Sequence, residues 1–142
     1  VMMVGKHAAK LALAEKHGAR PYLLADAAHF TLENGRRVDV VVECSGSARG
    51  LEMALRVVRP RGTLILKSTV ASMSTLHLAP IVIDEIRVQG SRCGPFAPAL
   101  RALSQRRVNV LPLITARYSL DDGLAAFKHA GQRDALKILV QV

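Results

Sequence analysis

The stretch VDVVVECSGSARGLEMALRVVRPRGTLILKST, residues 38–69, decides the fold class of this chain. Its first residues are mostly valine, which is typical of a strand buried on both faces. After SGS at 45–47, apolar residues recur at helical spacing from Leu51 to Val58. RPRG at 59–62 predicts a turn that closes this helix, and TLIL at 63–66 predicts a second strand. This order predicts two parallel strands joined by a helix.

The same alternation of strands and helices continues on both sides of this stretch. Further strands are predicted at residues 1–4, 22–25, 85–89 and 137–140, and further helices at 8–18, 95–106 and from 119 onward. Strands that alternate with helices predict an α/β fold, in which helices cover both faces of a parallel sheet.

Two of the later helices carry specific expectations. The helix at 95–106 is expected to bury Phe96, Leu100 and Leu103, because they share one face. Ser119 is expected to cap the helix that follows it, since a serine side chain can accept a hydrogen bond from the first free backbone N–H groups.

Length and composition limit the class of protein. The chain has 142 residues, of which 50% are hydrophobic and 22% charged, which is typical of one globular domain. It contains no apolar run long enough to cross a bilayer and no signal-peptide pattern, so we expect a cytoplasmic protein. Cys44 and Cys93 lie far apart and outside any Cys/His cluster, which gives no support for a metal site or a disulfide framework.

The net charge of +9 raises the question of an acidic partner. The basic residues are scattered along the chain, and aromatic residues make up only 4% of it. A surface that stacks on bases needs aromatic residues among its charges. We therefore expect neither a nucleic-acid partner nor a membrane partner, and interpret most of the charge as a solvated surface.

Small or polar residues follow four of the predicted strands, at 5–6, 44–46, 67–69 and 90–92. Each group on its own is compatible with an ordinary tight turn. In parallel sheets, however, ligands bind at the carboxyl ends of the strands, which all lie at one edge. Four such groups together predict a shared ligand at that edge.

Several segments together resemble a known family. VGKHAAKLALAEKHGA at 4–19, EIRVQGSRCGPF at 85–96, PLITARYSLDDGLAAFKHA at 112–130 and the stretch at 38–69 resemble the second half of medium-chain (zinc-type) alcohol and polyol dehydrogenases. The resemblance covers nearly the whole chain in the family's order. It is closest to an alcohol-dehydrogenase-like branch whose substrate is unknown.

The resemblance implies a Rossmann-type doubly wound parallel sheet. Residues 1–93 would form a partial nicotinamide-dinucleotide-binding domain, and residues 94–142 a C-terminal segment that returns towards the catalytic domain. Residues 1–4 match the family's second strand, so the first strand, the glycine-rich loop and the catalytic domain are expected to be missing. In the strand order 3-2-1-4-5-6, this would leave two inner edges without a neighbour. We expect such a fragment to be inactive and only marginally stable when alone.

The resemblance also assigns a cofactor, NADP or NAD. NAD-preferring members carry an acid where Gly5 stands, whereas Lys6 offers a positive charge to a 2′-phosphate, so NADP is slightly favoured. The residues expected to bind the cofactor are Gly5, Lys6, Lys10, Cys44, Ser45, Lys67, Ser68, Thr69, Ser91, Arg92 and Cys93. No catalytic residue and no metal ligand is expected within the chain, because the family's zinc ligands belong to the part of the parent protein without a match here.

The function implied is hydride transfer between a small-molecule alcohol or polyol and NAD(P), in a parent enzyme that holds zinc and forms a homo-oligomer. Two alternatives stay open: a zinc-free quinone or enone reductase of the same superfamily, and a non-enzymatic Rossmann-like binding module. Glu43, within a strand, is interpreted as a hydrogen-bonded structural carboxylate, and His129 as a surface histidine.

Overall fold

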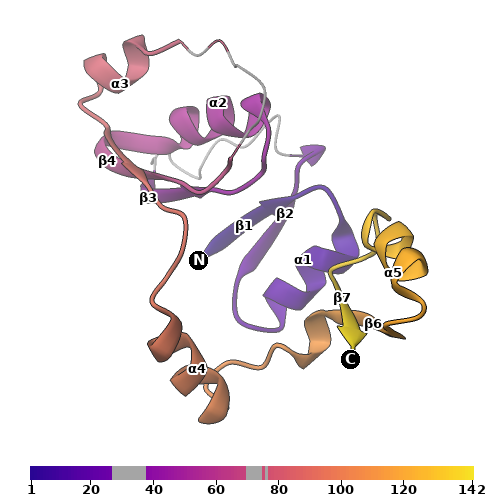
Figure 1. Ribbon diagram of the computed structural model, residues 1–142. Helices are drawn as coiled ribbons and strands as arrows, with labels where there is room; N and C mark the ends of the chain where they lie inside the picture. The colour runs from indigo at the N-terminus through magenta and orange to yellow at the C-terminus, as the bar shows by residue number, and fades with distance from the viewer. Residues whose placement is uncertain (27–37, 70–74, 76) are drawn as a thin grey trace. The chain divides into compact units, whose positions relative to one another are not determined.

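The computed structural model describes residues 1–26, 38–69, 75 and 77–142, and Figure 1 shows the chain. Strands and helices alternate along it. Their bounds are β1 Met2–Gly5, α1 Ala8–Glu15, β2 Arg20–Leu23, β3 Val38–Glu43, α2 Ala48–Val57, β4 Val58–Leu66, α3 Ala79–Ile83, β5 Arg87–Gly90, α4 Phe96–Ser104, the 3-10 helix η3 Leu111–Leu113, β6 Ile114–Ser119, α5 Gly123–Ala130 and β7 Lys137–Gln141.

The chain divides into two compact units, which are described separately. One comprises the described residues of 1–30 together with 95–142, and the other those of 31–94. The predicted division at residue 93 concerns the domains of a longer enzyme and stays a prediction.

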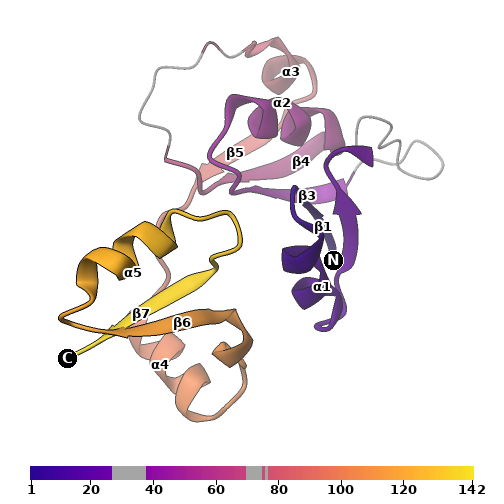
Figure 2. The ribbon, with the colours of Figure 1, turned by 90° about the vertical axis from the view of Figure 1, so that its right-hand side faces the viewer.

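The 31–94 unit contains a three-stranded parallel sheet in the order β3-β4-β5. Figure 2 shows α2 lying over one face of this sheet. The core lies between them: Val58 and Leu64 have no exposed surface, and Ala54, Leu55 and Ile86 pack with them. On β3, Val41 packs against this core, whereas its neighbours Val40 and Val42 point to the other face and are exposed.

Helix α2 begins where the sequence changes from alternation to helical spacing. Ser47 is its N-cap and accepts a hydrogen bond from the Gly50 N–H at 3.2 Å. Gly46 in the preceding turn has φ +70°, a left-handed conformation that glycine adopts without steric cost. The interruption at 45–47 therefore ends β3 and starts α2.

The predicted turn at 59–62 is instead part of β4. The strand starts directly after α2, and its register shifts: Val38 pairs with Val58, but Val40 pairs with Thr63. Arg61 takes φ 60° within this irregular stretch, and its N–H donates to Asp84 O at 2.7 Å. Residues 59–62 of β4 lie opposite the single residue of β3 between Val38 and Val40, so they form a bulge.

The other unit contains two parallel pairs, β1-β2 and β6-β7. Helix α1 packs on β1 and β2, and α5 packs on β6 and β7 (Figure 1). Leu11 of α1 and Ala126 of α5 are buried in these contacts. Lys10 Nζ donates a hydrogen bond to Ala135 O at 3.0 Å and so connects the first part of this unit to its last part.

Every strand pair is parallel, which confirms the predicted α/β class with parallel sheets. Among the described strands, β1 pairs with β2 alone and β3 pairs with β4 alone. Each of these two strands therefore keeps one edge without a described neighbour.

Two expectations about the later helices are wrong. Phe96, Leu100 and Leu103 on α4 are exposed, by 77%, 50% and 44%. Helical spacing predicts an apolar face, but burial also requires another element to cover it, and α4 makes few contacts with the other described elements. Asp122, not Ser119, is the N-cap of α5. Ser119 ends β6, and its Oγ accepts a hydrogen bond from the Asp122 N–H at 3.3 Å, so it caps the turn before the helix.

None of the helices in the described ranges combines the length and the apolar character needed to span a bilayer.

Candidate functional site

The candidate site lies where the three strands of the 31–94 unit end. Because β3, β4 and β5 are parallel, their carboxyl ends share one edge of the sheet. Eight of the eleven predicted cofactor-binding residues follow these strands: Cys44, Ser45, Lys67, Ser68, Thr69, Ser91, Arg92 and Cys93. All of them are exposed except Ser68, which is half-buried. We call this edge the rim.

Glu43 links the first two strand ends of the rim. It is the last residue of β3, and only 5% of it is exposed. Its Oε1 accepts a hydrogen bond from the Ser45 N–H at 2.7 Å. One residue further on, the Gly46 N–H donates to Ser68 Oγ at 2.7 Å. The turn after β3 is thus connected to its own strand and to the end of β4.

The electrostatics of Glu43 are set by two opposing causes. Burial raises the pKa of this carboxyl, since it disfavours the charged form. Hydrogen bonds from the Ser45 and Ser68 hydroxyls and from the Ser45 N–H stabilise the carboxylate and lower its pKa. The hydrogen bonds prevail, so the pKa of Glu43 lies below its ordinary value. Glu43 is therefore a hydrogen-bonded carboxylate, as the sequence predicted.

This lowered pKa predicts how stability depends on pH. The unfolded chain binds a proton at Glu43 more readily than the folded chain does, so acid favours unfolding. The contribution of Glu43 should be complete well above about pH 4.3, the ordinary pKa of glutamate, and should be lost as pH falls from there through the folded pKa. Urea unfolding of the wild type and of Glu43→Gln, measured from pH 3 to pH 7, checks this. A free-energy difference that grew towards acid pH would contradict the prediction.

Lys67 links the second and third strand ends. Its Nζ donates hydrogen bonds to Arg92 O at 3.1 Å and to Ser91 O at 3.5 Å. The ammonium group therefore holds the segment after β5 beside the end of β4. Its charged group thus binds backbone carbonyls of the rim, and the cofactor contact predicted at Lys67 stays a prediction.

The other three predicted residues lie in the second unit. Gly5 ends β1 beside the buried Leu11, and Lys6 is exposed in the turn that follows. Lys10 on α1 donates its hydrogen bond to Ala135 O. The structure thus groups the predicted residues into two sets, one in each unit. Their roles in binding a cofactor stay predictions.

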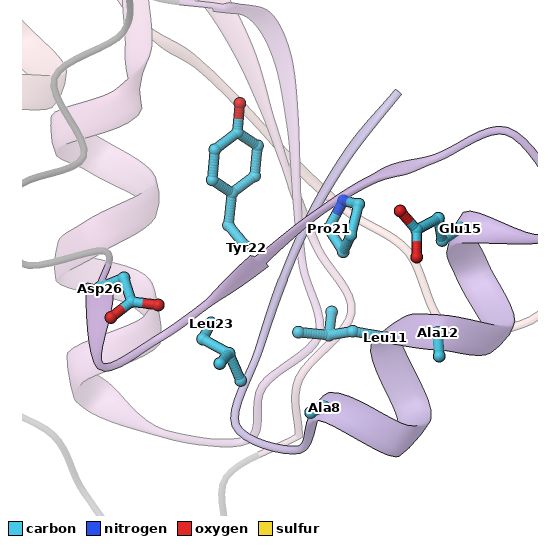
Figure 3. A pocket seen from close by; sticks show the side chains of 8 residues that line it. All are labelled: Ala8, Leu11, Ala12, Glu15, Pro21, Tyr22, Leu23 and Asp26. Carbon is cyan, nitrogen blue, oxygen red and sulfur yellow. The ribbon is translucent and has the colours of Figure 1, made fainter.

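A pocket of about 370 Å³ lies between α1 and β2 (Figure 3). Leu11 points from α1 towards β2, and Glu15 and Asp26 lie towards opposite ends. Its lining is Ala8, Leu11, Ala12, Glu15, Pro21, Tyr22, Leu23 and Asp26, which includes no predicted cofactor-binding residue. Two carboxylates beside an apolar floor oppose a phosphate-bearing ligand. This pocket is therefore not the candidate dinucleotide site.

The described residues do not fit a zinc ion. Within the described ranges, no group of three or more His, Cys, Asp or Glu side chains could hold a metal. Cys44 and Cys93 are exposed free thiols. A structural or catalytic zinc site needs three or four such ligands around one point, so no reaction step is assigned to zinc in this part of the chain.

One side-chain pair was not predicted from the sequence. Tyr118 Oη and His129 Nδ1 are hydrogen-bonded at 2.8 Å, and their rings meet edge to face at 5.9 Å between centroids. His129 is half-buried in this contact, so its interpretation as a surface histidine is wrong. Tyr118 lies on β6 and His129 on α5, and no spacing rule relates them. The pair attaches α5 to the β6-β7 sheet.

Three comparisons with known proteins bear on this site. Sorbitol dehydrogenase of Pongo abelii is 30% identical over 109 residues, which cover 75% of this chain and 30% of that protein. L-idonate 5-dehydrogenase of Escherichia coli is 27% identical, with a TM-score of 0.87, over 99% of this chain and 42% of that one. A Sinorhizobium meliloti protein crystallised with NADP is 24% identical, with a TM-score of 0.85, over 100% of this chain and 45% of that one, which shows the shared fold.

The chain therefore spans less than half the length of the proteins it resembles. Residues 1–107 match the sequence profile of the zinc-binding dehydrogenases, and this match includes the whole rim. On that evidence, the chain belongs to the zinc-binding dehydrogenase family.

Proposed function

We propose that this chain is the cofactor-binding part of an oxidoreductase that transfers hydride between an alcohol or polyol and NAD(P). The observation that carries the proposal is the rim, where three parallel strands end together in small or polar, mostly exposed residues. Dinucleotides bind at this edge of doubly wound sheets. Sorbitol and L-idonate dehydrogenases are named after hydroxyl-bearing compounds, which favours an alcohol or polyol over a quinone or enone.

The rim residues fit a nicotinamide dinucleotide. Ser45 and Ser68 offer hydroxyl groups, and Arg92 offers an exposed guanidinium that suits a phosphate or carboxamide oxygen. Lys67 holds the Ser91 and Arg92 carbonyls in place. When bound, the nicotinamide ring supplies the hydride chemistry, and the chain's own residues bind and orient it. A zinc ion would require ligands other than the described residues.

The 2′-phosphate of NADP distinguishes it from NAD, and the surroundings of Gly5 favour NADP. An acidic side chain at this position would oppose a phosphate by about 1 kcal/mol in water at 4 Å. Gly5 removes that repulsion, and the exposed Lys6 next to it supplies a positive charge. We therefore propose NADP as the preferred cofactor.

Replacing Gly5 by aspartate should shift this preference towards NAD. The ratio of the NADPH and NADH dissociation constants is expected to change by about fivefold, which corresponds to 1 kcal/mol. Fluorescence titration of the longest natural protein that contains these residues, with NADPH and with NADH, measures this ratio.

Gly5→Ala is the matched control for this prediction. A Cβ at Gly5 would lie 3.0 Å from Leu11 Cδ2, so both substitutions place the same Cβ against Leu11 and only aspartate adds a charged carboxylate. Equal ratios in Gly5→Asp and Gly5→Ala would contradict the assignment of Gly5 to the ribose end of the cofactor.

The reaction itself is tested on the longest natural protein that contains these residues. Purified enzyme is assayed for NAD(P) reduction with sorbitol, L-idonate and butanediol, and for quinone reduction by NAD(P)H. Reduction of NAD(P) by an alcohol supports the proposal, and quinone reduction in a metal-free preparation overturns it. A cytoplasmic location and a homo-oligomeric state are predictions that cell fractionation and light scattering check.

A further inference from the structure

We propose that Glu43 is a positioning residue for the cofactor: through the Ser45 N–H and the Ser68 hydroxyl, its buried carboxylate fixes the shape of the rim. This inference rests on the proposed function, because the rim is where the nicotinamide cofactor would bind. Glu43 is 95% buried, so a ligand at the rim would not contact its carboxylate directly. Its effect on a ligand would therefore be indirect, through the segments that follow β3 and β4, which contain Ser45 and Ser68.

The hydrogen bonds around Glu43 run in one direction. The Gly46 N–H donates to Ser68 Oγ at 2.7 Å, and the Ser68 hydroxyl in turn bonds the Glu43 carboxylate. The Ser45 N–H donates to the same carboxylate at 2.7 Å. An ionised carboxylate only accepts hydrogen bonds, so it satisfies both donors at once. Glu43 therefore orients two successive N–H groups of the β3–α2 turn, one directly and one through Ser68.

The carboxylate has little room to move. A Cβ added at Gly50, in the first turn of α2, would lie 3.0 Å from Glu43 Oε1 and 2.8 Å from Ser45 Cβ. The backbone of α2 thus leaves no room for a side chain at position 50 beside the carboxylate and the serine. In the described residues no buried polar side-chain atom lacks a hydrogen-bond partner. A fully satisfied buried network specifies one arrangement of the groups that it joins.

Glutamine has the same size as glutamate but cannot reproduce this pattern. Its carbonyl oxygen can still accept from the Ser45 N–H, but its amide group donates. If the glutamine amide group faced Ser68, Ser68 Oγ would have to accept hydrogen bonds both from that amide and from the Gly46 N–H. The Ser68 hydroxyl would then no longer have a carboxylate to which it can donate. Glu43→Gln therefore tests the acceptor role of the carboxylate without creating a cavity.

The experiment compares four forms of the chain. These are the wild type, Glu43→Gln, Ser68→Ala and the control Glu52→Gln, whose side chain is exposed on α2 and 4.0 Å from Arg56. Amide hydrogen exchange, followed residue by residue by NMR, reports on the rim without any cofactor. Fluorescence titration with NADPH and NADH reports on binding, and it uses the longest natural protein that contains these residues, with the same substitutions. Urea unfolding shows how much of each effect is global.

In Glu43→Gln, exchange at Ser45 and Gly46 should become about tenfold faster relative to Leu64, a core residue of the same unit. The dissociation constant for the preferred nucleotide should rise about tenfold, because the rim would have to be ordered on binding. Ser68→Ala should likewise make amide exchange at Gly46 faster and weaken nucleotide binding. Glu52→Gln should change neither the exchange rates nor the dissociation constants.

Equal acceleration at Ser45, Gly46 and Leu64 would overturn the inference, since Glu43 would then only stabilise the unit as a whole. Unchanged exchange at Ser45 and Gly46 would overturn it as well. If the wild type binds neither nucleotide, the proposed function fails for this chain, and the exchange rates still decide whether Glu43 fixes the rim. If Glu43→Gln does not fold, Ser68→Ala supplies the same comparison through Gly46.

Discussion

Replacing Leu64 by alanine is expected to lower the free energy of unfolding of the 31–94 unit by about 2–5 kcal/mol. Leu64 lies on β4, has no exposed surface and packs with Val58 and Leu55 beneath α2. Alanine removes buried methyl groups and leaves a cavity that the two neighbouring strands cannot collapse to fill. Urea unfolding, followed by hydrogen exchange of the β3 and β4 amides, measures the loss.

The matched control is Val88→Ala on the adjacent strand β5. Val88 pairs with Leu64 in the sheet register but is 40% exposed. Val88→Ala should therefore lower the free energy of unfolding much less than Leu64→Ala does, because it removes less buried apolar surface. If the two substitutions had equal effects, the core of this unit would not lie between α2 and β4.

Replacing Gly62 by alanine should destabilise the same unit by about 1–3 kcal/mol, although it adds only one methyl group. An added Cβ would lie 2.7 Å from Val58 Cγ2, 2.8 Å from Arg59 O and 2.9 Å from Asp39 O. Two of these atoms belong to the backbone, so relief requires a shift of the β3–β4 pairing at the bulge. Thermal and urea unfolding check the expected loss.

Gly90→Ala is the control for this second prediction. Gly90 ends β5 in the same unit, and a Cβ there would meet nothing within 4 Å. Its substitution should change the free energy of unfolding by less than about 1 kcal/mol. A Gly62→Ala variant as stable as Gly90→Ala would show that the bulge at 59–62 is not packed against Asp39.

The order of the elements could be predicted from the sequence because it depends on short-range patterns. The valine run at 38–42 forms β3, the serine and glycine residues at 45–47 end it, and helical spacing produces α2. Both patterns extend over only a few residues, so local propensity decides them. The prediction of a turn at RPRG, residues 59–62, is wrong, because a proline and a glycine also suit a bulge within a strand.

The position of the candidate site was predictable for a similar reason. Once the strands are parallel, their carboxyl ends share an edge, and the residues after β3, β4 and β5 lie there. The use of each side chain was not predictable. The ammonium groups of Lys67 and Lys10 bind backbone carbonyls 25 and 125 residues away in the sequence, and no pattern of neighbouring residues predicts these partners.

The sequence by itself determined the succession of strands and helices, their parallel arrangement and the family, because each rests on neighbouring residues or on their order. Only the tertiary structure decided that Glu43 joins Ser45 to Ser68, that α5 is attached through Tyr118 and His129, and that the apolar face of α4 is exposed. The physical reason is that a polar group selects the partner nearest in space, and that an apolar face is buried only if another element reaches it.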